Sequence, residues 1–128
     1  MAGVPGADSP HLPYPAPIDA YGNGGFRFAG MSHRGSILCL PDGIWAWPVA
    51  TIADLTEAML APALSRADAL DLFLIGAGRD PSALRADLRR LFHDAGISVD
   101  CLATGPAAQT YNILLGERRR VGAGLIAV

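Results

Sequence analysis

Residues 70–102 constrain the fold of this 128-residue chain more than any other stretch. Leu70 to Ile75 is an almost entirely apolar run of strand length, typical of a strand buried on both faces of a parallel sheet. The next apolar residues recur at helical spacing, opposite a charged face: Leu84, Leu88, Leu91, Phe92 and Ala95 against Arg85, Asp87, Arg89, Arg90 and Asp94. Ile97, Val99 and Cys101 then alternate as a second strand. The stretch therefore predicts a βαβ unit.

The ends of the central helix carry their own signals. Gly76-Ala77-Gly78 ends the first strand, Asp80 can cap a helix, and Pro81 suits a first helical turn, where its missing N–H costs nothing. Gly96 is well placed to end the helix in a left-handed conformation. These signals predict a helix from Pro81 to Ala95.

Short strands and a helix are expected before this unit. Tyr21–Gly25 indicates a turn, and strand-like runs follow at Phe26–Phe28, Ser36–Leu40 and Ile44–Trp47. They predict a small N-terminal antiparallel β region, in which Trp45 and Trp47 share one face and serve packing.

The next helix has capping-box spacing, with Asp54 and Glu57 at its start, and Pro62 is expected to end or kink it. Thr104-Gly105-Pro106 begins a further helix that Gly116 can end, and residues 121–128 read as a terminal strand. Five of the ten prolines fall in residues 1–17, which predicts a flexible tail before a single α/β domain over residues 18–128.

Composition excludes several functions. The net charge of −2 gives no electrostatic reason to expect nucleic acid or an anionic membrane as partner. No apolar run approaches the ~20 residues that span a bilayer, and the N-terminus lacks the pattern of a signal or transit peptide. We therefore expect no membrane insertion and a cytoplasmic location.

The inventory of reactive side chains predicts no catalytic site, no metal site and no cofactor. His11, His33 and His93 lie far apart in the sequence, in the tail, a loop and an exposed helix face. Cys39 and Cys101 lie in strand-like runs without zinc spacing, so we expect reduced thiols instead of a disulfide.

One crevice is nevertheless predicted. Gly76-Ala77-Gly78 resembles the start of a dinucleotide fingerprint, but the third glycine position is Pro81. If the two strands are parallel neighbours, this loop and Thr104–Pro106 leave the sheet at one edge, and two helix N-termini could hold an anion. The candidate residues are Gly76, Gly78, Arg79, Thr104, Gln109, Thr110, Tyr111 and Asn112. The alternative is two ordinary helix ends open to water, with Thr110, Tyr111 and Asn112 in structural roles.

Several segments at these spacings resemble a known family: Asp71–Gly78, Val99–Gly105, Ala107–Leu114, Glu117–Val121 and Leu125–Ile126, together with Tyr21–Phe28 and the region of Trp47. It is the family of uncharacterised bacterial and archaeal domains that includes the mitochondrial complex I assembly factor three and the adipogenesis-associated Mth-type domain protein. The resemblance implies a three-layer α/β fold around a mixed five-stranded sheet, with the last strand antiparallel to its neighbours. Many relatives have Arg where this chain has Gln109, which weakens anion binding there.

The resemblance also implies a function. The eukaryotic relative acts through protein partners and not as an enzyme, so we expect a non-catalytic protein-interaction domain resembling a respiratory complex assembly factor. The alternative is a small-molecule or anion-binding domain, or an enzyme, that uses the crevice at Gly76–Gly78 and Thr104–Asn112.

Overall fold

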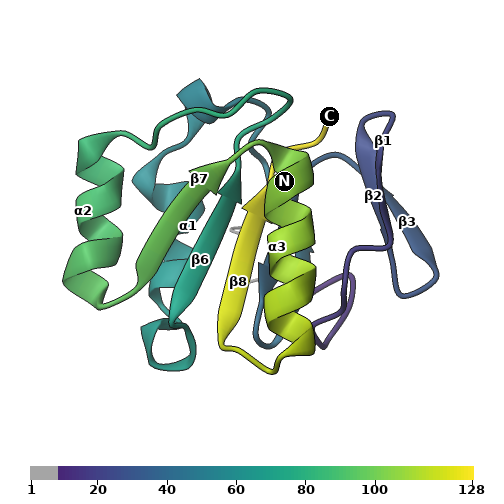
Figure 1. Ribbon diagram of the computed structural model, residues 1–128, viewed down its shortest axis with the longest axis horizontal. Helices are drawn as coiled ribbons and strands as arrows, with labels where there is room; N and C mark the ends of the chain where they lie inside the picture. The colour runs from purple at the N-terminus through teal and green to yellow at the C-terminus, as the bar shows by residue number, and fades with distance from the viewer. Residues whose placement is uncertain (1–8) are drawn as a thin grey trace.

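A mixed five-stranded sheet forms the centre of the molecule in the computed structural model, which describes residues 9–128 (Figure 1). Its strands lie in the order β5-β4-β8-β6-β7. Their bounds are β4 Ile37–Leu40, β5 Gly43–Ala46, β6 Leu72–Gly76, β7 Ser98–Leu102 and β8 Val121–Leu125. β6 is parallel to β7 and to β8, whereas β4 is antiparallel to β5 and to β8. The predicted α/β class is confirmed.

Two further layers cover this sheet. The helices α1 (Glu57–Leu64) and α2 (Ala86–Ala95) pack on one face, where Phe73 and Ile75 share a core with Phe92. The helix α3 (Thr104–Gly116) packs on the other face, where Leu74 shares a second core with Tyr111. A separate antiparallel sheet adjoins α3 through the second core (Figure 1); its strands are β1 Ala20–Gly22, β2 Gly25–Phe28 and β3 Met31–Arg34. Two single 3₁₀ turns, η1 Ile52–Asp54 and η2 Ala67–Ala69, flank α1.

The predicted βαβ unit is confirmed. β6 and β7 pair in parallel, from Leu72 opposite Ser98 to Gly76 opposite Leu102. α2 and α3 lie on opposite faces of the sheet. α2 connects β6 to β7 on one side of it, and α3 connects β7 to β8 on the other side of β6. Because these two connections run in opposite directions across the sheet and lie on opposite faces, they have the same hand.

The expected antiparallel orientation of the last strand holds for one of its two neighbours and is wrong for the other. β8 is antiparallel to β4 but parallel to β6. The reason is the long α3 crossover, which carries the chain back along the sheet after β7, so that β8 runs in the same direction as β6 and β7.

The expected start of α2 is also wrong. The helix begins at Ala86, not at Pro81, and Arg85 before it has a non-helical backbone with no capping side chain. Leu84 is buried in the core under α1 and α2 although it lies outside the helix. Burial of this extended segment outweighs the local signals of Asp80 and Pro81. Gly96 does end the helix in the left-handed conformation, with φ of 76°.

The start of α1 differs from the capping-box prediction as well. Thr56 is the cap, and its side chain accepts a hydrogen bond from the N–H of Met59. Asp54 belongs to the preceding 3₁₀ turn, and Pro62 lies inside α1, which continues to Leu64.

The predicted N-terminal antiparallel region divides into two parts. β1, β2 and β3 form their own sheet, whereas β4 and β5 join the central one. Trp45 and Trp47 are both buried in the core, as the packing prediction requires. The indole N–H of Trp47 donates to the carbonyl of Met59, which ties the end of β5 to α1.

Part of the predicted flexible tail packs against the domain. Leu12 bridges to Ile44 at the outer edge of β5, and both Leu12 and Ala16 are buried. The packed structure therefore includes residues before Ile18. Residues 1–8 of the predicted tail lie outside the described residues.

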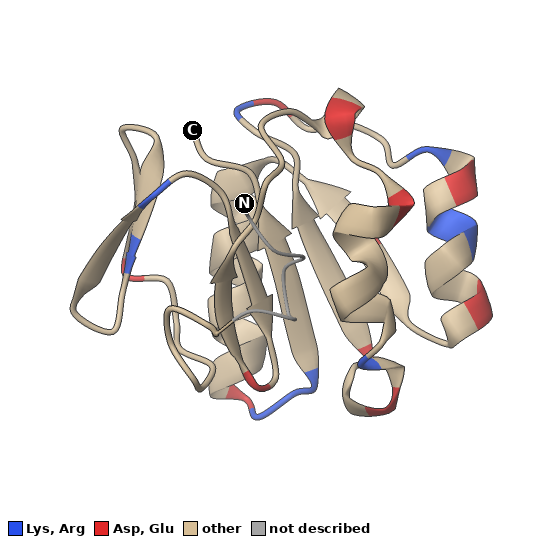
Figure 2. Ribbon diagram, turned by 180° about the vertical axis from the view of Figure 1, so that it is seen from behind, with Lys and Arg blue, Asp and Glu red and all other residues tan. Residues whose placement is uncertain are grey.

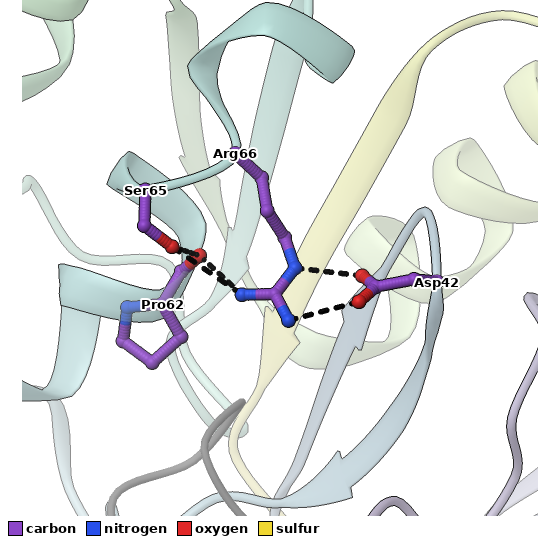
Figure 3. Close-up of polar contacts among 4 residues, drawn as sticks. All are labelled: Asp42, Pro62, Ser65 and Arg66. Atoms are coloured by element: carbon purple, nitrogen blue, oxygen red, sulfur yellow. Dashed lines mark hydrogen bonds and ion pairs between the residues drawn. The ribbon is translucent and has the colours of Figure 1, made fainter.

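An arginine clamp joins α1 to the β4–β5 turn (Figure 3). The guanidinium of Arg66 binds both carboxylate oxygens of Asp42, with N–O distances of 2.6 and 3.0 Å, and donates to the carbonyl of Pro62. It also lies 5.0 Å from the centre of a ring of Trp45. The ion pair holds the pKa of Asp42 below its usual range. Its partners lie in the β4–β5 turn and in α1, so the clamp stabilises the packing of these two elements.

Candidate functional site

The predicted crevice lies where β6 and β7 end. The structure brings Gly78, Arg79 and the start of α3 together, and a hollow of about 440 Å³ opens between them and the β1–β2 turn. Its lining residues are Tyr21, Gly22, Asn23, Gly78, Arg79, Ala103, Gly105, Pro106 and Val128. Gly76 and Thr104 lie beneath it in contact with each other, since a Cβ on Gly76 would stand 2.9 Å from the Cα of Thr104.

The two loops of the crevice bind each other. The N–H of Ala77 donates to the carbonyl of Leu102, at 2.7 Å, and the N–H of Thr104 donates to the carbonyl of Gly78, at 2.8 Å. The Thr104 hydroxyl accepts from the N–H of Gly78, at 3.0 Å, and donates to the carbonyl of Ile126, at 2.7 Å. The N–H groups of Ala77, Gly78 and Thr104, expected to face an anion, are thus bound inside the protein.

Among the helices of residues 9–128, α3 alone begins at this hollow. α2 starts beyond an extended segment, so the predicted pair of helix N-termini is not formed. At α3, the Tyr21 ring lies against Gly105, where a Cβ would stand 2.5 Å from the phenol oxygen. Arg79 lines the hollow together with Val128, and its guanidinium has no ion-pair or hydrogen-bond partner among residues 9–128.

Farther along α3, Tyr111 and Asn112 hold the N-terminal segment and do not line this hollow. Asn112 Oδ1 accepts from the N–H of Ile18, at 2.7 Å, and its Nδ2 donates to the carbonyl of the same residue, at 2.8 Å. The buried Tyr111 hydroxyl donates to the carbonyl of Ala16, at 3.4 Å. Burial, and then Cys39, raise the pKa of Tyr111, so the phenol stays protonated as this donor.

Gln109 and Thr110 complete the predicted set. Gln109 is exposed and Thr110 is half-buried, and neither lines the hollow. The structure therefore divides the eight predicted residues between the crevice, the packing of the N-terminal segment and the outer surface of α3.

The outer surface of α3 is a feature that sequence reasoning missed. Thr104–Gly116 contains no charged residue, although Pro106, Gln109 and Ile113 are exposed at helical spacing. Ile113 is 62% exposed, the largest value among the exposed large hydrophobic residues of the described chain. By contrast, the outer face of α2 carries charges of both signs (Figure 2). The signal was available in the sequence as the absence of charge over a whole helix.

The reactive side chains of the described residues do not converge. No three His, Cys, Asp or Glu side chains of residues 9–128 lie close enough to share a metal ion. His11 and His33 do pack together, with ring centroids 4.7 Å apart. Burial, and then the neighbouring His11, lower the pKa of His33.

The thiols are separate. Cys39 is buried and Cys101 is half-buried, and neither forms a disulfide. Burial raises the pKa of Cys39 to about 12, so this thiol is not a nucleophile at neutral pH.

These features can be compared with those of known proteins. Residues 18–126 match the family described as a protein of unknown function (DUF498/DUF598). The chain belongs to this family. The expected relationship to the complex I assembly factor and the Mth-type domain is confirmed by the named relatives.

Three relatives illustrate the relationship. The NADH dehydrogenase [ubiquinone] 1 alpha subcomplex assembly factor 3 of Mus musculus is 28% identical over 109 residues, which cover 85% of this chain and 59% of that protein. A solved structure described as an outer membrane protein from Bartonella henselae has a TM-score of 0.89 and 47% identity, covering 92% of this chain and 99% of the other. A Mth938-like domain of Bordetella pertussis has a TM-score of 0.77 and 28% identity, covering 87% and 85%.

The chain spans less than two thirds of the length of the mouse assembly factor. Among the described residues, every helix is too short or too polar to cross a bilayer.

Proposed function

We propose that this protein is a non-catalytic protein-interaction domain that serves the biogenesis of a respiratory complex, acting from the cytoplasm through the outer surface of α3. The observation that carries the proposal is an exposed helix without charge. A second line of support comes from the similar mouse protein, whose name describes an assembly factor of NADH dehydrogenase.

The physical argument starts from how exposed helices are built. A helix with one face on a sheet normally carries charged and polar groups on the other face, as α2 does. On α3, the outward positions Pro106, Gln109 and Ile113 present an apolar ring, an amide and an aliphatic chain. Charge is depleted in the centres of protein interfaces, where it would have to be desolvated. The outer surface of α3 therefore suits a partner with an uncharged, largely apolar surface of its own.

The test is affinity purification of the tagged protein from a bacterium that expresses it, followed by mass spectrometry. Ile113→Arg places a charge at the centre of the surface. Ala86→Arg is the matched control, because it adds the same side chain at an exposed position of α2.

We expect the unchanged protein and the Ala86→Arg variant to recover the same subunit or assembly protein of the respiratory NADH dehydrogenase. Ile113→Arg should reduce its recovery about tenfold, since burying an unpaired charge costs more than ~1.4 kcal/mol. Equal recovery by both variants, or recovery of no respiratory protein at all, would overturn the proposal.

A second function rests on the hollow at Gly78 and Arg79. Its volume of about 440 Å³ and the unpaired guanidinium support a small anionic ligand, with binding or chemistry at the crevice. An Arg79→Ala variant separates the two proposals. If α3 is the interface, the variant should recover the partner as well as the unchanged protein does. If the function depends on a ligand at the crevice, the variant should lose the activity of the protein in the cell.

A further inference from the structure

The small sheet has an outer face that the core does not use. Phe26 and Phe28 of β2 are buried in the second core, so the alternate residues of β2 point away from it. The strand register places six residues on this outer face: Ala20 and Gly22 of β1, Gly25 and Arg27 of β2, and Ser32 and Arg34 of β3.

Two arginines are diagonal neighbours on this face. Arg27 lies opposite Ser32, and Arg34 lies opposite Gly25, two residues along the same strand. Diagonal positions stand roughly 7–8 Å apart, within reach of two long side chains that approach one group. Gly22 and Gly25 add no side chains, and a hollow of about 390 Å³ lies here.

The charge in this hollow has one sign. No acidic residue contributes to its lining in the described chain, and neither guanidinium has an ion-pair or hydrogen-bond partner among residues 9–128. Arg66, Arg85 and Arg120, by contrast, each bind a carboxylate. Figure 2 shows the blue segments of the small sheet at a distance from the charges of α2, with one red segment close to them. Asp19 precedes β1 and donates its backbone N–H to the carbonyl of Arg27, but it does not line the hollow. Like charges that face each other across strands repel, and an anion between them removes this repulsion.

The hollow continues toward the crevice. Tyr21 and Gly22 of β1 and Asn23 of the β1–β2 turn line both spaces. The crevice is lined by Arg79 and also by Val128, at the end of the described chain. The two hollows therefore adjoin each other at the end of β1.

We propose that the outer face of the small sheet binds the phosphoryl group of a small phosphorylated metabolite. The guanidinium groups of Arg27 and Arg34 grip the phosphoryl oxygens, in the planar geometry that suits arginine, and the Ser32 hydroxyl donates a further hydrogen bond. This site is separate from the outer surface of α3 and does not depend on the proposed interaction.

The test is a titration of ¹⁵N-labelled protein with inorganic pyrophosphate at low ionic strength. The test variant is Arg27→Ala/Arg34→Ala, and the matched control is Arg89→Ala/Arg90→Ala, which removes the same charge from exposed positions of α2. Both pairs are exposed, and urea unfolding checks that both variants keep their stability.

We expect saturable shifts of the amides of Gly25, Arg27, Ser32 and Arg34 in the unchanged protein and in the control. The Arg27→Ala/Arg34→Ala variant should bind about tenfold or more weakly, because charge-assisted hydrogen bonds are lost. Shifts that do not saturate, or an equal loss in both variants, would overturn the site.

A second arm distinguishes the source of the phosphoryl group. Vesicles of phosphatidylcholine with phosphatidylglycerol are sedimented with the protein. Sedimentation that requires Arg27 and Arg34, without any saturable pyrophosphate binding, would replace the small metabolite with a lipid headgroup and refute the proposal as stated.

Discussion

Replacing Thr104 by Val tests whether this residue is structural or faces a ligand. Thr104 is fully buried, and its hydroxyl joins the loop after β6 to the segment after β8 by accepting from the N–H of Gly78 and donating to the carbonyl of Ile126. Valine has nearly the same shape, so the variant removes both hydrogen bonds without opening a cavity.

The expected loss of stability follows from these two bonds. A buried polar group left without a partner costs about 1–3 kcal/mol. For the carbonyl of the buried Ile126 the cost lies at the upper end of this range. For the N–H of Gly78 the cost is lower, because this residue is half-buried and its N–H can bind a water molecule instead. We expect Thr104→Val to lower the free energy of unfolding by about 2–4 kcal/mol. Thr104→Ser keeps the hydroxyl and should lose only about 1 kcal/mol, for one methyl group.

The assay is urea unfolding at equilibrium, followed by circular dichroism, for the original protein and both variants. Unchanged m-values would show that the variants unfold to the same extent. A Val variant as stable as the Ser variant, or more stable, would refute the reasoning, because the two buried bonds would then contribute nothing.

Three further predictions concern the packing at Gly124, the Asp42–Arg66 ion pair and the buried thiol of Cys39. Gly124→Ala should destabilise the protein by about 1–3 kcal/mol, because the new Cβ would stand 2.5 Å from the ring of Trp47; thermal unfolding measures this, and an unchanged Tm would contradict it. Asp42→Asn should cost about 1 kcal/mol at neutral pH, since Arg66 loses its carboxylate. The folded-state pKa of Asp42 is lowered, so this difference should persist above the usual pKa of Asp and shrink in acid as pH falls through the folded-state value; a pH-independent difference would argue against the ion pair. Cys39 should react with a thiol reagent only on unfolding, and more slowly than the half-buried Cys101 in the native state; equal rates would refute its burial.

The parallel core of the fold could be predicted from the sequence because its signals are local. An unbroken apolar run, an amphipathic helix and an alternating strand each define an element without reference to the rest of the chain. The start of α2 could not be predicted this way, because burial of Leu84 in the core decides it against the capping signals of Asp80 and Pro81.

The predicted site shows the same limit. The sequence correctly places Gly78 and Thr104 at one edge of the sheet, because parallel strands end together. It does not show that these residues bond to each other. Nor does it show that Asn112 bonds to Ile18, because these partners lie 94 positions apart in the chain. A polar residue of a helix, such as Asn112, can be mistaken for part of a ligand site as long as its partner far away in the sequence is not known.

The uncharged surface of α3 is tested most directly by site-specific photo-crosslinking in living cells. A photoreactive amino acid replaces Gln109 or Ile113 on α3, and Asp94 on α2 serves as the control position. We predict crosslinks from both α3 positions to one and the same respiratory assembly partner, and none to it from Asp94. Crosslinks that arise equally from both helices, or from α2 alone, would contradict the assignment of α3 as the interface.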